Sequence, residues 1–179
     1  ENIRITCHTT KVLEMAYDRQ FDSVTSCYCL QWVDEKQKAF DAVYRSSKDE
    51  GRAYLYISIG GDAYWKWKKA VDEIKAENTR WKNVDDRPHM EPVEQWIKYA
   101  QQAGFTIVKQ TTFEVSRPYK NKQLFIDYAL SMGVADLEGQ EKEEFVSCVT
   151  DRFYELQGLK DDDEYNFNPL TLALHLVKE

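Results

Sequence analysis

The sequence predicts an α/β protein built on an open, mostly parallel sheet, and three neighbouring segments support this fold class. Val24–Leu30 and Ala53–Ile59 are rich in β-branched and aromatic residues, which is typical of strands. Between them, Phe40, Val43 and Tyr44 recur at the spacing of one helix face. A strand, a helix and a second strand in this order form a βαβ unit, whose two strands are parallel. Such sheets bind ligands at the carboxyl ends of their strands.

The remaining strands and turns follow from local patterns. Because Val24–Leu30 is mostly apolar, we expect this strand to be covered on both faces. We expect Gly51 to form a turn that closes the first helix region, and Gly60-Gly61 to end the strand Ala53–Ile59. Further strands are expected at Asn2–Cys7, Phe105–Val115 and Leu170–Val177.

Four further helices are expected along the chain. Asp62 is the expected N-cap of the first, Pro92 begins the second, and Gly104 follows the last residue of the second. The other two are expected at Gln123–Met132 and Glu141–Gln157. The apolar stripes are Trp67, Ala70, Val71 and Ile74 in the first helix, Val93, Trp96, Ile97 and Ala100 in the second, and Phe145, Val149, Phe153 and Leu156 in the last. The polar segment Thr79–Glu91 is expected to be a loop or a lid. The segment Asp161–Glu164 is expected to be an exposed acidic loop.

The composition is that of a globular protein and argues against two classes of partner. The 179 residues are 42% hydrophobic and 31% charged, which suits one domain with a buried core. The net charge of −7 argues against nucleic acid or an anionic membrane as a partner. No apolar run approaches the roughly 20 residues needed to span a bilayer.

The four cysteines form no CxxC pair, so we expect reduced thiols in a cytoplasmic protein. Because the chain opens at Glu1 rather than Met, we expect a trimmed fragment or a processed product.

A specific motif surrounds the end of the first strand of the βαβ unit. The chain reads Phe21-Asp22-Ser23-Val24-Thr25-Ser26-Cys27-Tyr28-Cys29-Leu30-Gln31-Trp32-Val33 there. This run resembles the class I S-adenosylmethionine-dependent methyltransferases, and most closely the juvenile hormone acid O-methyltransferase-like proteins of arthropods. Those proteins typically read Phe-Asp-x-Val-x-Ser-Phe-Tyr-Cys-Leu-His-Trp-Val at this place. The resemblance covers nearly the whole chain.

The resemblance implies the C-terminal two-thirds of a Rossmann-like methyltransferase fold, as a single domain of residues 1–179. The family sheet has the spatial order 3-2-1-4-5-7-6, and its seventh strand is antiparallel. The five expected strands of this chain match its third to seventh strands. The helices at about 120–160 match a cap insertion over the substrate.

Three departures separate this chain from the family pattern. The glycine-rich cofactor loop and the acidic end of the second strand are absent from this sequence. Thr9 stands where the family has an Asp near the adenine, and neighbouring His8 and Thr10 do not replace it. Gln31 replaces the corner His, and Lys48-Asp49-Glu50-Gly51 replaces the usual Lys-Pro-Gly-Gly turn. We therefore expect that this chain, as it stands, does not bind S-adenosylmethionine tightly.

The resemblance also implies a substrate class, which is a lipid-like carboxylic acid. Such an acid has an unperturbed pKa of about 4 to 5 and is already ionised at pH 7, so no general base is needed. The site has only to desolvate the carboxylate and align it with the methyl group. Gln31 and Trp32 then bind the substrate through their N–H groups. Ser26, Cys27 and Tyr28 match positions beside the cofactor, S-adenosylmethionine. No residue is assigned with certainty to catalysis, and none to a metal.

Each candidate residue also has a structural interpretation. Trp32 can be a core tryptophan at the start of the following helix, and Ser26–Tyr28 can be strand-end packing. The other four tryptophans divide by helical spacing: Trp67 and Trp96 are expected in the core, whereas Trp65 and Trp81 are lid candidates. The histidines His8, His89 and His175 have no partners at metal-ligand spacing and are expected to be structural.

Three functions remain open. The chain can be a piece of an active methyltransferase, a non-catalytic binding or assembly module, or a carrier of a small hydrophobic ligand. We also expect a homodimer. The strand Val24–Leu30 is central in the family and lacks one neighbour here, which leaves an edge that another strand can pair with. Asn2–Cys7 could fill this edge within its own molecule, or by exchange with a twofold partner.

Overall fold

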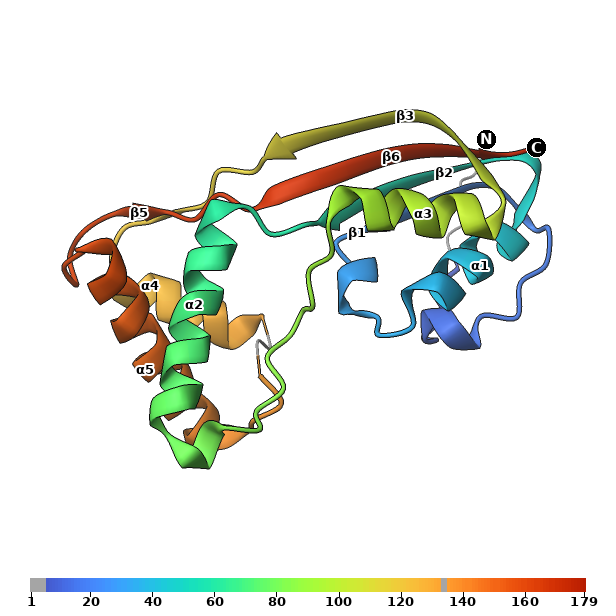
Figure 1. The fold of residues 1–179 in the computed structure, drawn as a ribbon. Coiled ribbons are helices and arrows are strands. Elements are labelled where there is room, and N and C mark those ends of the chain that lie inside the picture. Colours follow the sequence, from blue (N-terminus) through green and yellow to red (C-terminus); the bar gives the residue numbers. More distant parts are fainter. Residues whose placement is uncertain (1–5, 133–134) are drawn as a thin grey trace. The chain divides into compact units, whose positions relative to one another are not determined.

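The computed structural model describes residues 6–132 and 135–179, and the chain divides into two compact units (Figure 1). The first unit comprises residues 6–56, Val93–Thr111 and Ala173–Glu179, and the second comprises Ile57–Pro92 and Thr112–Leu172. The predicted α/β fold class is confirmed. The single domain of residues 1–179 and the cap insertion at about 120–160 stay predictions.

The main sheet has four strands in the order β1-β2-β6-β3. These strands are β1 (Phe21–Cys27), β2 (Ser47–Ser58), β3 (Phe105–Glu114) and β6 (Leu170–Lys178). β1 and β2 are parallel. β6 runs antiparallel to β2, because Leu170 N donates to Gly60 O at 2.9 Å while Lys178 Nζ reaches Ser47 O at 2.9 Å. This order is the 4-5-7-6 part of the expected topology, which is thereby confirmed. The predicted strand Asn2–Cys7 lies mostly outside the described residues, and its described end, Thr6 and Cys7, is exposed and in neither a helix nor a strand.

β1 departs from the prediction at its end and in its burial. It ends at Cys27 rather than Leu30, because Tyr28 has a φ of 52° and leaves the extended conformation. Its residues alternate between exposed and half-buried, so the prediction of a strand covered on both faces is wrong. The cause is its place at the edge of the described sheet, where β2 is its one neighbour.

The predicted turn at Gly51 is an irregularity inside β2. Phe21 of β1 pairs with Ser47, but Ser23 already pairs with Arg52, so the intervening residues of β2 bulge out of the ladder. A Cβ on Gly51 would lie 2.6 Å from a backbone oxygen. Glycine is therefore required at this position for steric reasons.

Two helices of the first unit cover one face of the sheet, α1 (Lys36–Ser46) and α3 (Val93–Ala103) (Figure 1). The helical stripes predicted for them are confirmed, since Phe40 and Trp96 are fully buried with their rings 6.2 Å apart. Alternate residues of the central strands are buried as well, namely Ala53, Leu55, Leu174 and Leu176. α3 ends where predicted, because Gly104 has a φ of 103°.

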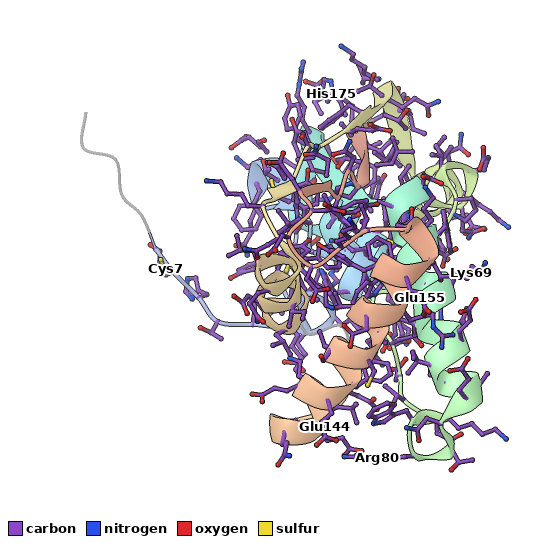
Figure 2. The ribbon with its side chains drawn as sticks, turned by 90° about the vertical axis from the view of Figure 1, so that its left-hand side faces the viewer. Cys7, Lys69, Arg80, Glu144, Glu155 and His175 are labelled. Carbon is purple, nitrogen blue, oxygen red and sulfur yellow. The ribbon has the colours of Figure 1, made fainter. Side chains whose placement is uncertain are left out.

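The second unit is a helical layer with a small sheet. Its elements are α2 (Asp62–Glu77), α4 (Lys122–Ser131), α5 (Gly139–Gln157) and the antiparallel pair β4 (Pro118–Tyr119) and β5 (Tyr165–Asn166). An aromatic core joins the three helices. Phe125 of α4 stacks on Phe153 of α5 at 5.4 Å, and Trp67 of α2 meets Phe153 edge-on at 5.8 Å. Ion pairs also stabilise this layer, for example Arg80, in the 3-10 helix Thr79–Trp81 that follows α2, with Glu144 of α5 at 2.7 Å (Figure 2).

Three predictions in the second unit are corrected. Asp62 is the first residue of α2 and not its N-cap, which is Gly61. Leu156 is 37% exposed, because Tyr154 takes the inward position on α5 instead. Trp81 is buried against Phe145 and is part of the core, not of a lid. Nowhere in residues 6–132 or 135–179 is there a helix both long and apolar enough to cross a bilayer.

Candidate functional site

The candidate site is the corner that follows β1 in the first unit. Tyr28 N donates to Tyr56 O at 2.8 Å, so the backbone is still attached to β2 where it turns. The φ of 52° at Tyr28 is one that residues other than glycine rarely adopt. The chain then forms the short 3-10 helix Leu30–Trp32. The corner therefore stands at the carboxyl end of a parallel strand pair, where the fold class predicts a ligand.

The structure brings all five predicted site residues to this corner, but their side chains do not share one face. Successive strand residues point to opposite faces of a sheet, so Ser26 and Cys27 diverge. Ser26, Tyr28 and Trp32 are half-buried, and Cys27 is exposed. The corner thus offers a ligand only part of the predicted set at one time.

Gln31 is the most enclosed member of the set. It is 3% exposed, and its Oε1 has no hydrogen-bond partner among the residues that the structure describes. A half rotation of the amide exchanges its oxygen and its NH2 group, so the side chain can present either a donor or an acceptor. A ligand reaches this amide only if the side chain moves, whereas the half-buried Trp32 is accessible as it stands.

The sequence did not indicate a second feature of the first unit. Tyr54 of β2 and His175 of β6 stack with ring centroids 4.7 Å apart, and His175 Nε2 is buried without a partner in the described chain. These residues come together only through the strand register. The expectation that His175 is structural fits this packing.

A third group lies in the second unit, at the segment that leads into β4. Arg117 Nη1 donates to the hydroxyl of Tyr128 at 2.5 Å, and its guanidinium lies 5.5 Å from the centre of that ring. The rings of Tyr119 and Tyr128 are 5.1 Å apart. All three side chains are half-buried. The signal available in the sequence was the run Arg117-Pro118-Tyr119 directly after the long strand.

Two tyrosines of the second unit have pKa values that rule them out as bases near neutral pH. Burial, followed by the field of Tyr128, raises the pKa of Tyr119 well above its ordinary value. Burial raises the pKa of Tyr64 to about 12, and its hydroxyl donates to Pro88 O at 2.8 Å. Both phenols therefore stay protonated and can act only as hydrogen-bonding groups.

Metal binding finds no support in the described part of the chain. Within residues 6–132 and 135–179 there is no group of three or more His, Cys, Asp or Glu side chains placed to hold an ion.

The glycine pair between β2 and α2 is closely packed against neighbouring protein atoms. Gly60 and Gly61 follow β2 and precede α2, and both have positive φ. A Cβ on Gly60 would meet the Tyr64 ring at 3.0 Å, and one on Gly61 would meet Leu170 N at 3.0 Å. A side chain at either position would therefore require its neighbours to shift.

Comparisons with known proteins agree with this architecture. Residues 1–55 match a family model described as a methyltransferase domain, and no curated protein matches the chain. A protein of Bacillus halodurans C-125, provisionally named a methyltransferase, is 16% identical with a TM-score of 0.61, over 94% of this chain and 75% of that chain. YcgJ of Bacillus subtilis is 12% identical with a TM-score of 0.56, over 95% of this chain and 69% of that chain. The 4+2 cyclase SpnF is 18% identical with a TM-score of 0.55, over 96% of this chain and 54% of that chain.

These likenesses establish the fold and leave the reaction open. The chain folds as the methyltransferases do, with their Rossmann-like sheet. It spans between about half and three quarters of the length of these structures. SpnF is a cyclase by name, so one fold carries more than one reaction.

Proposed function

We propose that this chain, folded as a methyltransferase, is the substrate-side part of an S-adenosylmethionine-dependent O-methyltransferase of lipid-like carboxylic acids. The observation that carries the proposal is the corner after β1, where the accessible Trp32 follows the carboxyl end of a parallel strand pair. The match of residues 1–55 to a methyltransferase domain supports the reaction. The resemblance of Ser26–Val33 to juvenile hormone acid O-methyltransferase-like proteins supports the substrate class.

The corner residues suit a reaction that needs alignment rather than proton transfer. A carboxylate substrate is ionised near neutral pH and is itself the nucleophile. The Trp32 indole N–H donates to one carboxylate oxygen, and the Gln31 amide joins it once the side chain turns outward. The apolar ring of Trp32 also displaces water from the anion, which strengthens the hydrogen bond. S-adenosylmethionine supplies the methyl group when it is bound.

The cofactor does not fit the described residues as a complete site, so the second part of the proposal is that the 179-residue chain binds it weakly. The glycine pair after β2 is in close contact with neighbouring protein atoms. Thr9 is exposed at the position where the family has an adenine-binding Asp. A backbone approaches a ligand closely only where glycines leave room. Calorimetric titration of this chain with S-adenosylmethionine is expected to show a Kd weaker than micromolar. Micromolar or tighter binding would contradict the proposal that this chain binds S-adenosylmethionine weakly.

The reaction itself is tested on the product of the natural gene. That protein is incubated with isotope-labelled S-adenosylmethionine and a series of medium-chain and long-chain carboxylic acids, and methyl esters are detected by mass spectrometry. The matching primary alcohols serve as the control for attack by a hydroxyl. We expect esters from the acids and no ethers from the alcohols. Absence of ester with every acid, in a protein that binds the cofactor, would remove the proposed reaction.

A second candidate function, a non-catalytic assembly module, is supported by β1. This strand has a single neighbour in the described sheet and exposes Phe21 at its start. An uncovered edge is a template for another strand. Exposed free thiols at Cys27 and Cys29 suit a reducing compartment, so we propose a cytoplasmic location for either function.

A further inference from the structure

Arg117 differs from the other arginines of the second unit, because no carboxylate among the described residues pairs with it. Arg80 pairs with Glu141 and Glu144, and Arg152 pairs with Glu73 and Glu77. Arg87 pairs with Asp85. In residues 6–132 and 135–179, Arg117 has no carboxylate partner, and its guanidinium hydrogen-bonds to the hydroxyls of Tyr128 and Tyr119. A half-buried cation without a partner in an acidic protein is a candidate receptor for an anion.

The surroundings hold this guanidinium in place. Phe167 N donates to Arg117 O at 3.0 Å, which fixes the backbone beside β5. The ring of Tyr128 lies under the guanidinium at 5.5 Å, and its hydroxyl accepts from Nη1. An arginine carries five N–H donors, so most of its donors remain available at the exposed side. The group is preorganised, which lowers the entropy cost of binding a planar anion.

Tyrosine hydroxyls and an apolar floor complete the site. The Tyr128 hydroxyl accepts from Arg117 and hydrogen-bonds to the Tyr119 hydroxyl, which leaves one hydroxyl proton of the pair to donate to a ligand. Tyr119 packs 5.1 Å from Tyr128 and 5.2 Å from buried Phe125. The charged rim therefore borders the aromatic core of the second unit, where charge–charge attraction is screened less than in water.

We propose that Arg117, Tyr119 and Tyr128 form a binding site for the carboxylate of an amphipathic organic acid. A planar carboxylate accepts two parallel hydrogen bonds from a guanidinium, and the remaining hydroxyl proton of the Tyr119–Tyr128 pair supplies one further donor at its edge. The apolar part of the ligand lies against the aromatic rings. The function proposed above places the substrate carboxylate at the corner with Trp32, so this is a second site, for a second molecule of the same class of acid. Only the choice of acid class rests on that function, and the binding site itself does not.

The first experiment needs no variant. Phenylglyoxal modifies accessible guanidinium groups, and peptide mass spectrometry follows Arg117 and Arg52 in the unaltered chain. Arg52 is the internal control, because it is exposed and has no ion pair among the described residues. We expect octanoate to slow the modification of Arg117 severalfold and to leave Arg52 unchanged, with no effect of 1-octanol on either. Equal slowing at both residues, no slowing at Arg117, or no reaction of Arg117 in the free chain would overturn the site.

The second experiment compares matched variants by calorimetric titration with octanoate. Arg117→Gln and Arg52→Gln change the net charge equally, so a difference between them is not a general electrostatic effect. We expect Arg117→Gln to weaken binding about tenfold to a hundredfold, as for a lost hydrogen bond to a charged group. Arg52→Gln should bind as the parent does, and Tyr128→Phe, which keeps the ring, should weaken binding by a smaller factor. Equal affinities of the parent and Arg117→Gln, with near-ultraviolet circular dichroism unchanged, would remove Arg117 from any site.

Protection of Arg117 by inorganic phosphate is compared with protection by octanoate, to distinguish a phosphate site from a carboxylate site. Protection of Arg117 by phosphate as strong as that by octanoate, at equal concentration, would overturn the assignment to a carboxylate. Both experiments measure binding without cofactor or turnover. Octanoate binding that depends on Arg117, in a protein that forms no ester, would support this site while removing the proposed reaction. Ester formation by a protein in which octanoate does not protect Arg117 would support the proposed reaction and remove this site.

Discussion

Trp32 and Gln31 are adjacent residues with different exposure, and this difference decides which of them can act on a ligand. Trp32 is half-buried at the corner, whereas Gln31 is 3% exposed. In the catalytically competent protein, we expect Trp32→Ala to lower kcat/KM about tenfold or more, because alignment of the anion is lost. Gln31→Ala should have a smaller effect on rate and a larger one on stability, since it empties a buried position.

The comparison uses an ester-formation assay and a urea unfolding curve for each variant. Val108→Ala is the control, because Val108 is 55% exposed and lies on β3, at the other edge of the sheet from β1. Equal kcat/KM values for Trp32→Ala and the parent would take Trp32 out of the site.

At the residue scale, the sequence predicted which residues gather at the corner but not how they face. Ser26 through Trp32 are close along the chain, so their proximity needed no tertiary information. The burial of Gln31 depends on how the turn packs, and the burial pattern of a single turn is not periodic. The group at Arg117 was missed because Tyr128 belongs to another element, and its contact with Arg117 arises only on folding.

Helix α5 offers a test of helical periodicity at the element scale. Phe153 and Leu156 were predicted on the same stripe, yet Phe153 is 0% exposed and Leu156 is 37% exposed. Phe153→Ala should lower the free energy of unfolding by about 3 to 5 kcal/mol, because its ring packs between Trp67 and Phe125. Leu156→Ala should cost less than about 1 kcal/mol. Chemical denaturation of the two variants checks this, and similar costs would contradict the placement of α5.

Ion pairs between α2 and α5 predict a pH dependence. Arg152 donates to Glu77 at 2.9 Å and 2.8 Å, and this contact lowers the pKa of Glu77 below its ordinary value of 4.5. A carboxyl whose folded-state pKa is lowered contributes stability above its unfolded pKa and loses that contribution as pH falls through the folded value. The stability difference between the parent and Arg152→Ala should therefore be largest near pH 7 and shrink below about pH 4.5.

The measurement is the denaturation midpoint of each protein across the acid range. Arg45→Ala is the matched control, since Arg45 donates to the backbone oxygen of Met15 and has no carboxylate partner in the described chain. Its difference from the parent should stay constant over the same range. A difference for Arg152→Ala that persists unchanged at pH 3 would contradict the role of Glu77.

Helices and strands were predicted well where a long apolar stripe runs along them or a glycine marks their end. The helices α1, α3, α4 and α5 lie within a few residues of their predicted positions. The end of β1 was placed too late, because the left-handed backbone at Tyr28 has no signal in a residue type that favours strands. The start of β2 was placed too late for a related reason: its first residues form a bulge rather than a regular ladder.

For the molecule as a whole, the edge of β1 that has no neighbouring strand in the described chain predicts self-association. β1 carries one charged residue, Asp22, whereas the opposite edge strand β3 carries Lys109 and Glu114, which discourage pairing. We propose a homodimer joined along β1. Light scattering is expected to show twice the 21.1 kDa mass of the chain. Thr25→Lys on β1 should shift the equilibrium towards the monomer, and Thr111→Lys on β3 should not.

A single 21.1 kDa species over a wide concentration range would overturn the dimer. That outcome would direct attention to the segment Asn2–Cys7, which could cover β1 within its own molecule. Strand order was predictable at this scale because it followed from the family topology. The division into two compact units was not, since it cuts through strands that the sequence presents as continuous.

The position of β6 in the sheet determines which strands can pair early in folding and which pair last. β1, α1 and β2 are consecutive in the chain, so their pairing closes only a short loop and can form early. β6 is the last strand described, yet it is inserted between β2 and β3. Until it arrives, those two strands have no common neighbour and each leaves an edge open. During synthesis the sheet therefore cannot be completed until β6 has been made. The incomplete chain, with unpaired edges on β2 and β3, is the species most prone to aggregation.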